Sequence, residues 1–516
     1  MDTILILDFG SQTTQLISRR IRESGVYSVI APGDTLLERV LNPEVKGVIL
    51  SGSPCSVYDR GAPEPDPRVY DLDIPVLGIC YGAQRIIQDH GGRVASLDKK
   101  EYGRARIRLE SEHPLFAGFP HDFLSWMSHG DTIEDIPEGF SAAGWSENRL
   151  PAFIVHNQKR IYGIQFHPEV THTEQGDLLL ANFALRICGA RKQWNVETYL
   201  EQIRTRVAER VGEEQVLLLI SGGVDSTVVA ALLLDTLAPD QVHLMYIDTG
   251  LMRLSETGEV RRLLKQLGAK NLHFIDASER FYASLSGVDD PEEKRRIIGD
   301  LFVEVQAREV GRLGIANAFL AQGTLYTDMI ESGKGVGNKA TVIKSHHNVR
   351  SPLIEEKRKQ GLLLEPLATL YKDEVRELGR KLGLTEETVR RHPFPGPGLA
   401  VRILGEVTPE KCDILRQADA IYIEELKCRD LYDRIWQAFA VLLPICSVGV
   451  SGDMRSYGHV LALRAVVSRD GMTADVFQFP PRDLLEISAR ITNSVREIGR
   501  VVYDTSSKPP ATIEWE

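Results

Sequence analysis

The hydrophobic positions in the first part of the chain form short apolar runs separated by stretches with helical spacing. Three such runs cover residues 4–7, 47–50 and 76–79, and each leads into a glycine-containing turn. Between the first two, residues 12–24 repeat apolar side chains at helical intervals, which places Ile17 and Ile21 on one face. Apolar strands that alternate with helices are buried on both faces. The first 190 residues therefore predict a parallel sheet covered by helices.

The same order of elements returns after residues 192–211, which have the pattern of a charged helix. A strand at 216–220, a glycine-containing turn, an apolar helix at 227–237 and a strand at 242–247 follow. This is the order of a βαβ unit, whose two strands are parallel. We therefore predict a second α/β domain that begins near residue 193.

A stretch rich in proline and glycine at 391–399 is typical of a rigid linker. Beyond it, strand and helix patterns alternate again, for example at 460–467 and 483–495. The predicted fold class is α/β, with two open parallel-sheet α/β domains and a smaller C-terminal α+β domain. The expected domains cover residues 1–192, 193–391 and 392–516.

Charge and composition narrow the classes of function. The 516 residues carry a formal net charge of -11, which argues against nucleic-acid binding, because such proteins need a cationic surface. No apolar stretch reaches the roughly 18 residues that a membrane span needs, and the start of the chain lacks a secretory signal. Six cysteines without a CxxC pair predict reduced thiols and a cytoplasmic location.

Glycines two residues before and two residues after Cys80 mark a candidate nucleophile. Residues 78–82 follow a predicted buried strand and precede a predicted helix, which is the pattern of a nucleophile elbow with cysteine in place of serine. Glycine permits such a tight turn, and the helix N-terminus favours a thiolate. The alternative is a buried, unreactive cysteine, which is common among free cysteines.

Residues that complete a catalytic triad lie farther along the chain. His167 and Glu169 are two positions apart, and in an extended segment such side chains share a face. His167 can take the thiol proton while Glu169 orients the imidazole, although a lone pair of this kind is often only a surface pair. The backbone N–H groups of Gly52 and Tyr81 are candidates for stabilising an oxyanion.

These motifs resemble those of a known family. The sequences GICYGAQ at 78–84 and FHPEV at 166–170 are similar to the signatures of the class I glutamine amidotransferases. The resemblance covers residues 2–192 and makes glutamine the substrate. It implies that Cys80 forms a glutamyl thioester, that His167 is the acid and base, and that Glu169 orients it.

The turn Ser-Gly-Gly-Val-Asp-Ser at 221–226 joins a predicted strand to a predicted helix. Small residues let backbone N–H groups surround a phosphate at the positive end of the helix. Asp225 would repel the phosphate unless Mg²⁺ lay between them. The alternative is a simple glycine turn with a helix cap. No Walker A sequence occurs, which excludes a P-loop kinase or GTPase.

The same turn resembles the pyrophosphate-binding motif of the N-type ATP pyrophosphatases. The resemblance implies that ATP adenylates a substrate oxygen and that pyrophosphate leaves. It makes Asp225 the expected Mg²⁺ ligand, and the expected ATP-binding residues are Ser221, Gly222, Gly223, Val224, Asp225, Ser226 and Thr227. Placing both sites on one chain would let ammonia reach the activated acceptor before the ammonia escapes into water or the acceptor is hydrolysed.

Four further stretches, 291–299, 343–348, 391–399 and 508–516, resemble signatures of the GMP synthetase family. The resemblance implies that XMP is the acceptor, that its O2 is adenylated and that ammonia displaces AMP at C2. It also implies a homodimer formed through the last domain, and it carries XMP contacts onto Arg295, Lys508, Ile513 and Glu514. From spacing alone, surface charges on a frayed terminus are the alternative.

The stretch 333–348 has the composition of a loop. Its Lys339 and Lys344 are candidates for a lid that offsets phosphate charge, and a solvated loop is the alternative. The chain departs from the family's usual pattern at Thr327, at 350–353 and at Ser507. Two rival interpretations remain, namely a synthetase for another acceptor, such as NAD synthetase, and a nucleotide-binding protein without catalysis.

Overall fold

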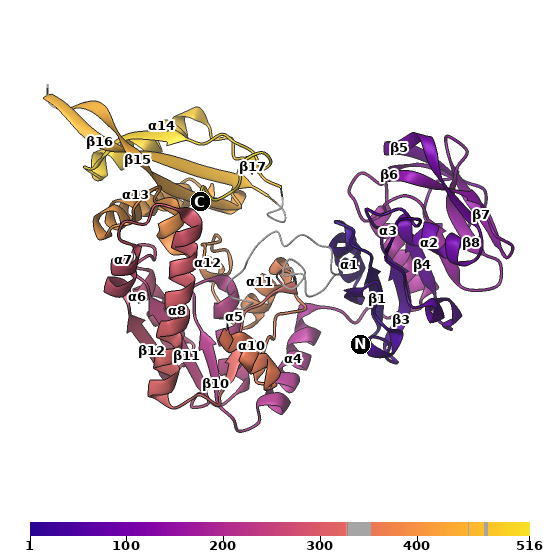
Figure 1. Cartoon of the computed structure of the whole chain (residues 1–516), viewed down its shortest axis with the longest axis horizontal. Helices are drawn as coiled ribbons and strands as arrows, with labels where there is room; N and C mark the ends of the chain where they lie inside the picture. The colour runs from indigo at the N-terminus through magenta and orange to yellow at the C-terminus, as the bar shows by residue number, and fades with distance from the viewer. Residues whose placement is uncertain (327, 329–351, 452–453, 469–472) are drawn as a thin grey trace. The chain divides into compact units, whose positions relative to one another are not determined.

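The computed structural model describes residues 1–326, 328, 352–451, 454–468 and 473–516. The chain divides into two compact units, one built on Met1–Glu201 and the other beginning at Gln202 (Figure 1). Among the described residues, no helix is both long enough and apolar enough to cross a membrane.

The first unit contains a nine-stranded sheet with the strand order β2-β1-β3-β4-β9-β8-β7-β5-β6. Its parallel part consists of β2 (Tyr27–Pro32), β1 (Thr3–Asp8), β3 (Val45–Leu50), β4 (Val76–Ile79) and β9 (Ile161–Ile164). The helices of this unit include α1 (Thr14–Glu23), α2 (Tyr81–Asp89) and α3 (Gly176–Asn182). Ile17 and Ile21 of α1 are fully buried in one core with Ile4 and Ile6 of β1, so the predicted apolar face of this helix is confirmed.

The rest of this sheet is antiparallel, which differs from the purely parallel sheet that the sequence predicted. These strands are β8 (Pro151–His156), β7 (Phe140–Ser146), β5 (Arg93–Leu109) and β6 (Asp122–Asp135). Along β5, exposed Arg104, Arg106 and Arg108 alternate with buried Ala105 and Ile107. Strands of this kind have one solvated face and are typical of antiparallel sheets. The alternation of charged and apolar residues in the sequence could therefore have predicted this part of the sheet.

The second unit contains a five-stranded parallel sheet with the order β12-β11-β10-β13-β14. Its strands are β10 (Val216–Leu219), β11 (Val242–Asp248), β12 (Asn271–Asp276), β13 (Phe319–Ala321) and β14 (Leu363–Leu364). Its helices include α5 (Val224–Thr236), α6 (Glu256–Gln266), α7 (Ser278–Leu285), α8 (Pro291–Leu313), α10 (Pro352–Lys359), α11 (Lys372–Lys381) and α12 (Glu386–Val389), and α4 (Val196–Val211) precedes the sheet. The turn before α5 therefore lies at the carboxyl edge of β10, where open α/β sheets bind ligands.

The C-terminal part begins with α13 (Pro409–Cys428) and continues with a long antiparallel hairpin of β15 (Gln437–Ser451) and β16 (Met454–Val467) (Figure 1). The strands β17 (Asp475–Val476) and β18 (Ile498–Tyr503) also pair with β16, and α14 (Pro481–Ser494) lies between them in sequence. One hydrophobic core joins Leu217 and Met245 of the parallel sheet to Ala438 and Leu461 of the hairpin. The predicted fold class is confirmed, and the exact domain bounds stay a prediction.

Candidate active sites

Cys80 lies between β4 and α2 in a strained backbone conformation, with φ 53° and ψ -107°. Positive φ is uncommon outside glycine, and it marks the sharp turn of a nucleophile elbow. Steric crowding explains why glycine occurs at both neighbouring positions, Gly78 and Gly82. A Cβ on Gly82 would lie 2.3 Å from the Leu50 carbonyl oxygen, and one on Gly78 would lie 2.5 Å from the carbonyl carbon of Gly82. The strand, turn and helix can therefore pack this closely only because neither position carries a side chain.

His167 and Glu169 lie beside this cysteine. The Nδ1 of His167 is 2.8 Å from the Oε1 of Glu169, whose side chain is 1% exposed. Burial lowers the pKa of His167, but the charges of Glu169 and Cys80 and its hydrogen bonds to both raise that pKa well above its usual range. An imidazolium next to a cysteine sulfur stabilises the thiolate.

The loop after β3 contacts the same imidazole. A Cβ on Gly52 would lie 3.4 Å from the Cε1 of His167, so the backbone of this glycine lies against the ring. The Gly82 N–H donates to the Ser51 carbonyl at 3.0 Å, which joins this loop to the elbow. Tyr81 is the first residue of α2, and the first N–H groups of a helix have no partner within it. Gly52 and Tyr81 thus both lie next to the reactive groups.

The turn after β10 is organised by its own hydroxyl groups. Ser221 Oγ lies 3.1 Å from Ser226 Oγ and accepts from the Gly223 N–H at 3.3 Å. The Thr227 hydroxyl donates to the Gly223 carbonyl at 2.8 Å. Gly222 has φ 78°, and a Cβ there would lie 3.1 Å from Glu256 Oε1. The turn therefore keeps a tight shape at the N-terminus of α5, as a phosphate cradle requires.

Two basic residues that sequence reasoning missed contact this turn. Lys372, the first residue of α11, donates to both carboxylate oxygens of Asp225 at 2.6 and 2.7 Å. Arg391 donates to the Gly222 carbonyl at 3.0 Å. Lys372 is 147 positions from Asp225 in sequence, so no local spacing could have revealed the contact.

The donor set at this turn fits Mg²⁺ only in part. Asp225 supplies one carboxylate, and the described residues hold no group of three or more His, Cys, Asp or Glu side chains that could bind a metal ion. Mg²⁺ in nucleotide sites commonly uses one or two carboxylates together with substrate phosphates and water. The residues present therefore fit a Mg²⁺ ion that arrives with ATP rather than a metal held by protein alone.

The C-terminal segment is not frayed, because buried basic side chains hold it. Arg402 is fully buried, and it donates to both oxygens of the Glu514 carboxylate at 2.8 and 3.1 Å. Gln437 also donates to Glu514, at 2.7 Å. The equally buried Lys294 donates to the side-chain carboxylate of Glu516, and its neighbour Arg295 donates to a main-chain oxygen of Glu516. Two of the predicted XMP residues, Arg295 and Glu514, thus take part in the contacts that hold this segment in place.

The other two predicted XMP residues also lie in this part of the chain. Ile513 is buried in a small core with Phe439 and Val441 of the hairpin, and its carbonyl accepts from Arg464 at 3.4 Å. Lys508 pairs with Ala474 through backbone hydrogen bonds of 2.8 and 3.0 Å. The segment that carries three of the four predicted XMP residues is therefore held at Lys508 and at Ile513 as well.

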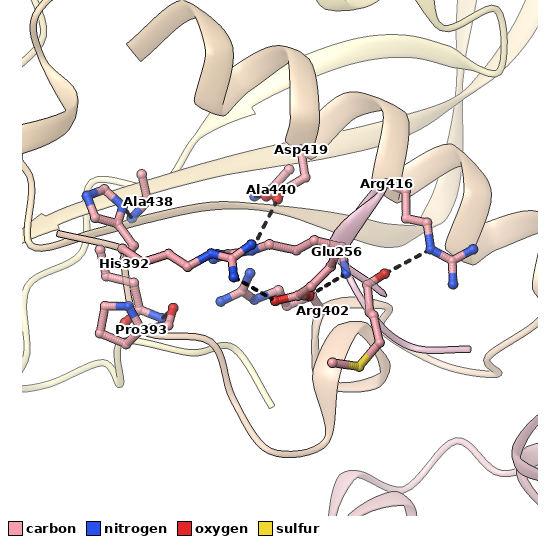
Figure 2. Close-up of polar contacts among 12 residues, drawn as sticks. Glu256, His392, Pro393, Arg402, Arg416, Asp419, Ala438 and Ala440 are labelled. Carbon is pink, nitrogen blue, oxygen red and sulfur yellow. Dashed lines mark hydrogen bonds and ion pairs between the residues drawn. The ribbon is translucent and has the colours of Figure 1, made fainter. Parts of the chain in front are cut away.

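A second polar cluster joins the proline-rich stretch to the hairpin (Figure 2). His392 Nδ1 accepts from the Ala438 N–H at 3.2 Å, and its Nε2 lies 3.0 Å from the Tyr432 carbonyl. Burial lowers the pKa of His392 to about 4, so the ring is neutral at physiological pH and Nε2 carries the proton. Asp419 accepts from the Ala440 N–H at 2.9 Å. These bonds fix the start of β15 to the residues that precede it.

Glu514→Ala is expected to lower the free energy of unfolding by about 3–5 kcal/mol, because it leaves Arg402 buried without its counter-charge. Calorimetry of the ligand-free protein would show this as a lower thermal midpoint. Replacing both partners with methionine should recover much of the loss, since no buried charge is then left unpaired. A midpoint unchanged by Glu514→Ala would contradict a structural role for this pair.

Some predicted residues lie outside the described part of the chain. These are both lysines of the predicted lid, Lys339 and Lys344, and the departures at Thr327, Arg350 and Ser351. Pro352 and Leu353 begin α10, and the Ser507 hydroxyl donates to the Pro509 carbonyl at 3.0 Å. The lid stays a prediction.

Comparison with known proteins identifies three matching families. Residues 5–187 match the class-I glutamine amidotransferases, residues 195–303 match NAD synthase, and residues 424–515 match the GMP synthase C-terminal domain. A glutamine-hydrolysing GMP synthase of Aquifex aeolicus is 51% identical over 99% of both chains. Enzymes of the same name from Thermosipho africanus and Phenylobacterium zucineum are 49% and 50% identical over nearly their full length. The chain therefore belongs to the family of glutamine-hydrolysing GMP synthases.

Proposed function

We propose that this enzyme makes GMP from XMP, with ATP as the activating co-substrate and glutamine as the nitrogen donor. The observation that carries the proposal is the presence, in one chain of this family, of a cysteine elbow with its His–Glu pair and a phosphate turn that is not a Walker A loop. The first centre is suited to releasing ammonia, and the second is suited to activating the acceptor that takes it up.

At the first centre, Cys80 attacks the amide carbon of glutamine and forms a thioester. His167 gives its proton to the leaving ammonia and then activates the water that hydrolyses the thioester. Glu169 keeps the imidazole in the required orientation, as its 2.8 Å bond to Nδ1 supports. The N–H groups of Gly52 and Tyr81 donate to the oxyanion that forms at each attack.

At the second centre, the backbone and hydroxyl groups of residues 221–227 hold the phosphates of ATP. Asp225 would hold Mg²⁺ there, which supplies positive charge to the phosphates. Lys372 lies within hydrogen-bonding distance of the same carboxylate and adds a second cation next to the phosphates. The O2 of XMP attacks the α-phosphate of ATP, which releases pyrophosphate and leaves AMP on O2, and ammonia then displaces AMP at C2.

In this proposal XMP is bound by Arg295 of α8 and by Lys508, Ile513 and Glu514 of the terminal segment. One observation favours a ligand here. The Nη1 of Arg402, the fully buried partner of Glu514, has no hydrogen-bond partner among the described residues. A buried guanidinium N–H normally finds an acceptor, and a nucleotide phosphate or carbonyl would supply one. Lys339 and Lys344 are proposed to cover the bound nucleotide.

We further propose the domain bounds 1–192, 193–391 and 392–516 and a cytoplasmic location, which six unpaired cysteines support. The proposed substrates are the small molecules XMP, ATP and glutamine, and we propose no nucleic-acid or membrane partner. This division assigns ammonia release to the first domain, ATP to the second and much of the XMP site to the third.

A homodimer formed through the β15–β16 hairpin is also proposed. The hairpin exposes a group of large apolar side chains, namely Ile445, Val448, Val450, Met454 and Tyr457, each at least 51% exposed. Val448 and Tyr457 are cross-strand partners and so share one face of the hairpin. Exposed apolar groups of this kind mark protein contacts, and a second copy of the chain offers an equivalent surface.

Val450→Glu combined with Tyr457→Glu is expected to turn the dimer into a monomer, because burying two carboxylates in an apolar contact is unfavourable. Light scattering would show the mass falling from twice that of the chain to that of one chain. Tyr58→Glu, which changes an exposed aromatic residue of the first unit, should leave the mass unchanged. A dimer that survives the double substitution would rule out this surface.

The acceptor can be tested directly with purified enzyme, glutamine, ATP and either XMP or nicotinate adenine dinucleotide. The proposal predicts AMP and an aminated product with XMP only. Product from the dinucleotide would instead support NAD synthesis. If neither acceptor gave glutamate or AMP, the chain would be a nucleotide-binding protein without catalysis.

A further inference from the structure

The loop between β1 and α1, near the N-terminus, contacts the residues beside Cys80. We propose that Thr13 is a positioning residue for glutamine hydrolysis, whose hydroxyl fixes the Glu169 carboxylate and, through it, the His167 imidazole. The inference rests on the proposed roles of Cys80, His167 and Glu169, and it adds a residue that no motif of the sequence indicates.

The contact itself is short and partly buried. The Thr13 hydroxyl donates to Glu169 Oε1 at 2.6 Å, across 156 positions of sequence. His167 Nδ1 lies 2.8 Å from the same oxygen. The other oxygen, Oε2, is buried and has no hydrogen-bond partner among the described residues. A single carboxylate oxygen thus receives both bonds, and Thr13 is the group that holds it toward the imidazole.

The directions of these hydrogen bonds follow from the donors available. An ionised carboxylate only accepts, so Thr13 uses its single hydroxyl proton on Glu169. Ser11 Oγ lies 2.9 Å from Thr13 Oγ1 and must therefore be the donor in that pair. Ser11 Oγ accepts in turn from the Thr13 N–H at 3.2 Å. The hydroxyl of Thr13 is thereby fixed from one side and directed to Glu169 on the other.

A purely structural role for Thr13 would be to cap α1. Threonine before the first helical residue usually accepts a hydrogen bond from a backbone N–H of the first turn. Thr13 occupies this position, but its side chain makes no such bond. Its hydroxyl is directed to the triad instead of to the helix.

The same loop also contacts the oxyanion side of the site. A Cβ on Gly52 would lie 3.3 Å from Ser11 Oγ and 3.4 Å from His167 Cε1. Ser11, Thr13, Gly52 and the imidazole are therefore in one tight group, and a shift of the loop would be transmitted to the imidazole through Glu169.

The test removes the hydroxyl without changing the shape of the side chain. Thr13→Val is expected to lower kcat of the glutamine-dependent reaction about 10- to 100-fold, the range set by one hydrogen bond to a charged group. The KM for glutamine should stay within about twofold, because Thr13 acts on the chemical step and not on binding. The rate with added ammonia should not change, and Thr13→Ser, which keeps the hydroxyl, should restore most of the activity.

Two comparisons separate this role from a loss of stability. Ser18→Ala removes a buried hydroxyl of the same helix, which bonds to Ser28, and should leave the glutamine-dependent kcat unchanged. In a Glu169→Ala background, Thr13→Val should cause no additional loss, because a residue that acts through Glu169 has nothing left to orient. Equal losses in both backgrounds, or a normal kcat for Thr13→Val, would overturn the inference.

The outcome also distinguishes this inference from the proposed function. If Cys80→Ala keeps glutamine-dependent synthesis, the proposed function of the first centre fails. If Cys80→Ala abolishes that synthesis while Thr13→Val has no effect, the proposed function stands and only the role of Thr13 is wrong.

Discussion

Cys80→Ala is expected to abolish GMP synthesis with glutamine and to leave synthesis with added ammonia intact. The substitution removes the only atom that forms the thioester, and loss of the nucleophile from a triad can cost on the order of 10⁶-fold in rate. The ammonia-dependent reaction uses only the proposed ATP and XMP sites, and Cys80 is part of neither. The measurement is the initial rate of GMP formation with each nitrogen source at saturating XMP and ATP.

Cys428→Ala is the matched control for this substitution, since Cys428 is an exposed free cysteine of α13. It should leave both rates unchanged. If Cys80→Ala lost both activities while remaining folded, the two centres would not be separable. If it kept the glutamine-dependent rate, Cys80 would be a buried, unreactive cysteine after all.

Asp225→Asn is expected to abolish AMP formation with either nitrogen source. The substitution keeps the size of the side chain but removes its charge, and with it the carboxylate proposed to hold Mg²⁺. A loss of about 3 kcal/mol of transition-state stabilisation corresponds to roughly 100-fold in rate, and a metal ion at phosphates supplies at least this much. Release of pyrophosphate from ATP in the presence of XMP is the direct readout.

Asp235→Asn is the matched control, because Asp235 lies on the same helix and pairs with Arg204 at the surface. It should not change the rate. A near-normal rate for Asp225→Asn would remove the metal role of this carboxylate and leave its bond to Lys372 as its only function. Raising the Mg²⁺ concentration should not restore Asp225→Asn fully, since an amide oxygen is a poorer ligand than a carboxylate.

The parts of both sites that could be predicted from the sequence are those in which a short segment carries the chemistry. The glycines around Cys80 and the spacing of His167 and Glu169 are local, because a strand–turn–helix junction and an extended segment each fix geometry over a few residues. The turn at 221–226 was predictable for the same reason. The apolar face of α1 followed from its helical period alone.

The rest depended on contacts between segments far apart in the chain. Thr13 reaches Glu169 across 156 positions and Lys372 reaches Asp225 across 147, and neither residue type is unusual where it occurs. The pairing of Arg402 with Glu514 spans 112 positions. This pairing argues against the alternative of a frayed terminus, which rested on position in the chain and not on burial.

The central claim is that nitrogen released at Cys80 reaches the XMP activated at the phosphate turn. The most direct measurement supplies glutamine labelled with ¹⁵N at the amide, together with ATP and XMP, and analyses the GMP by mass spectrometry. The account predicts labelled GMP in amounts equal to the AMP and glutamate formed. Glutamate and AMP without labelled GMP, or cleavage of ATP to ADP, would contradict it.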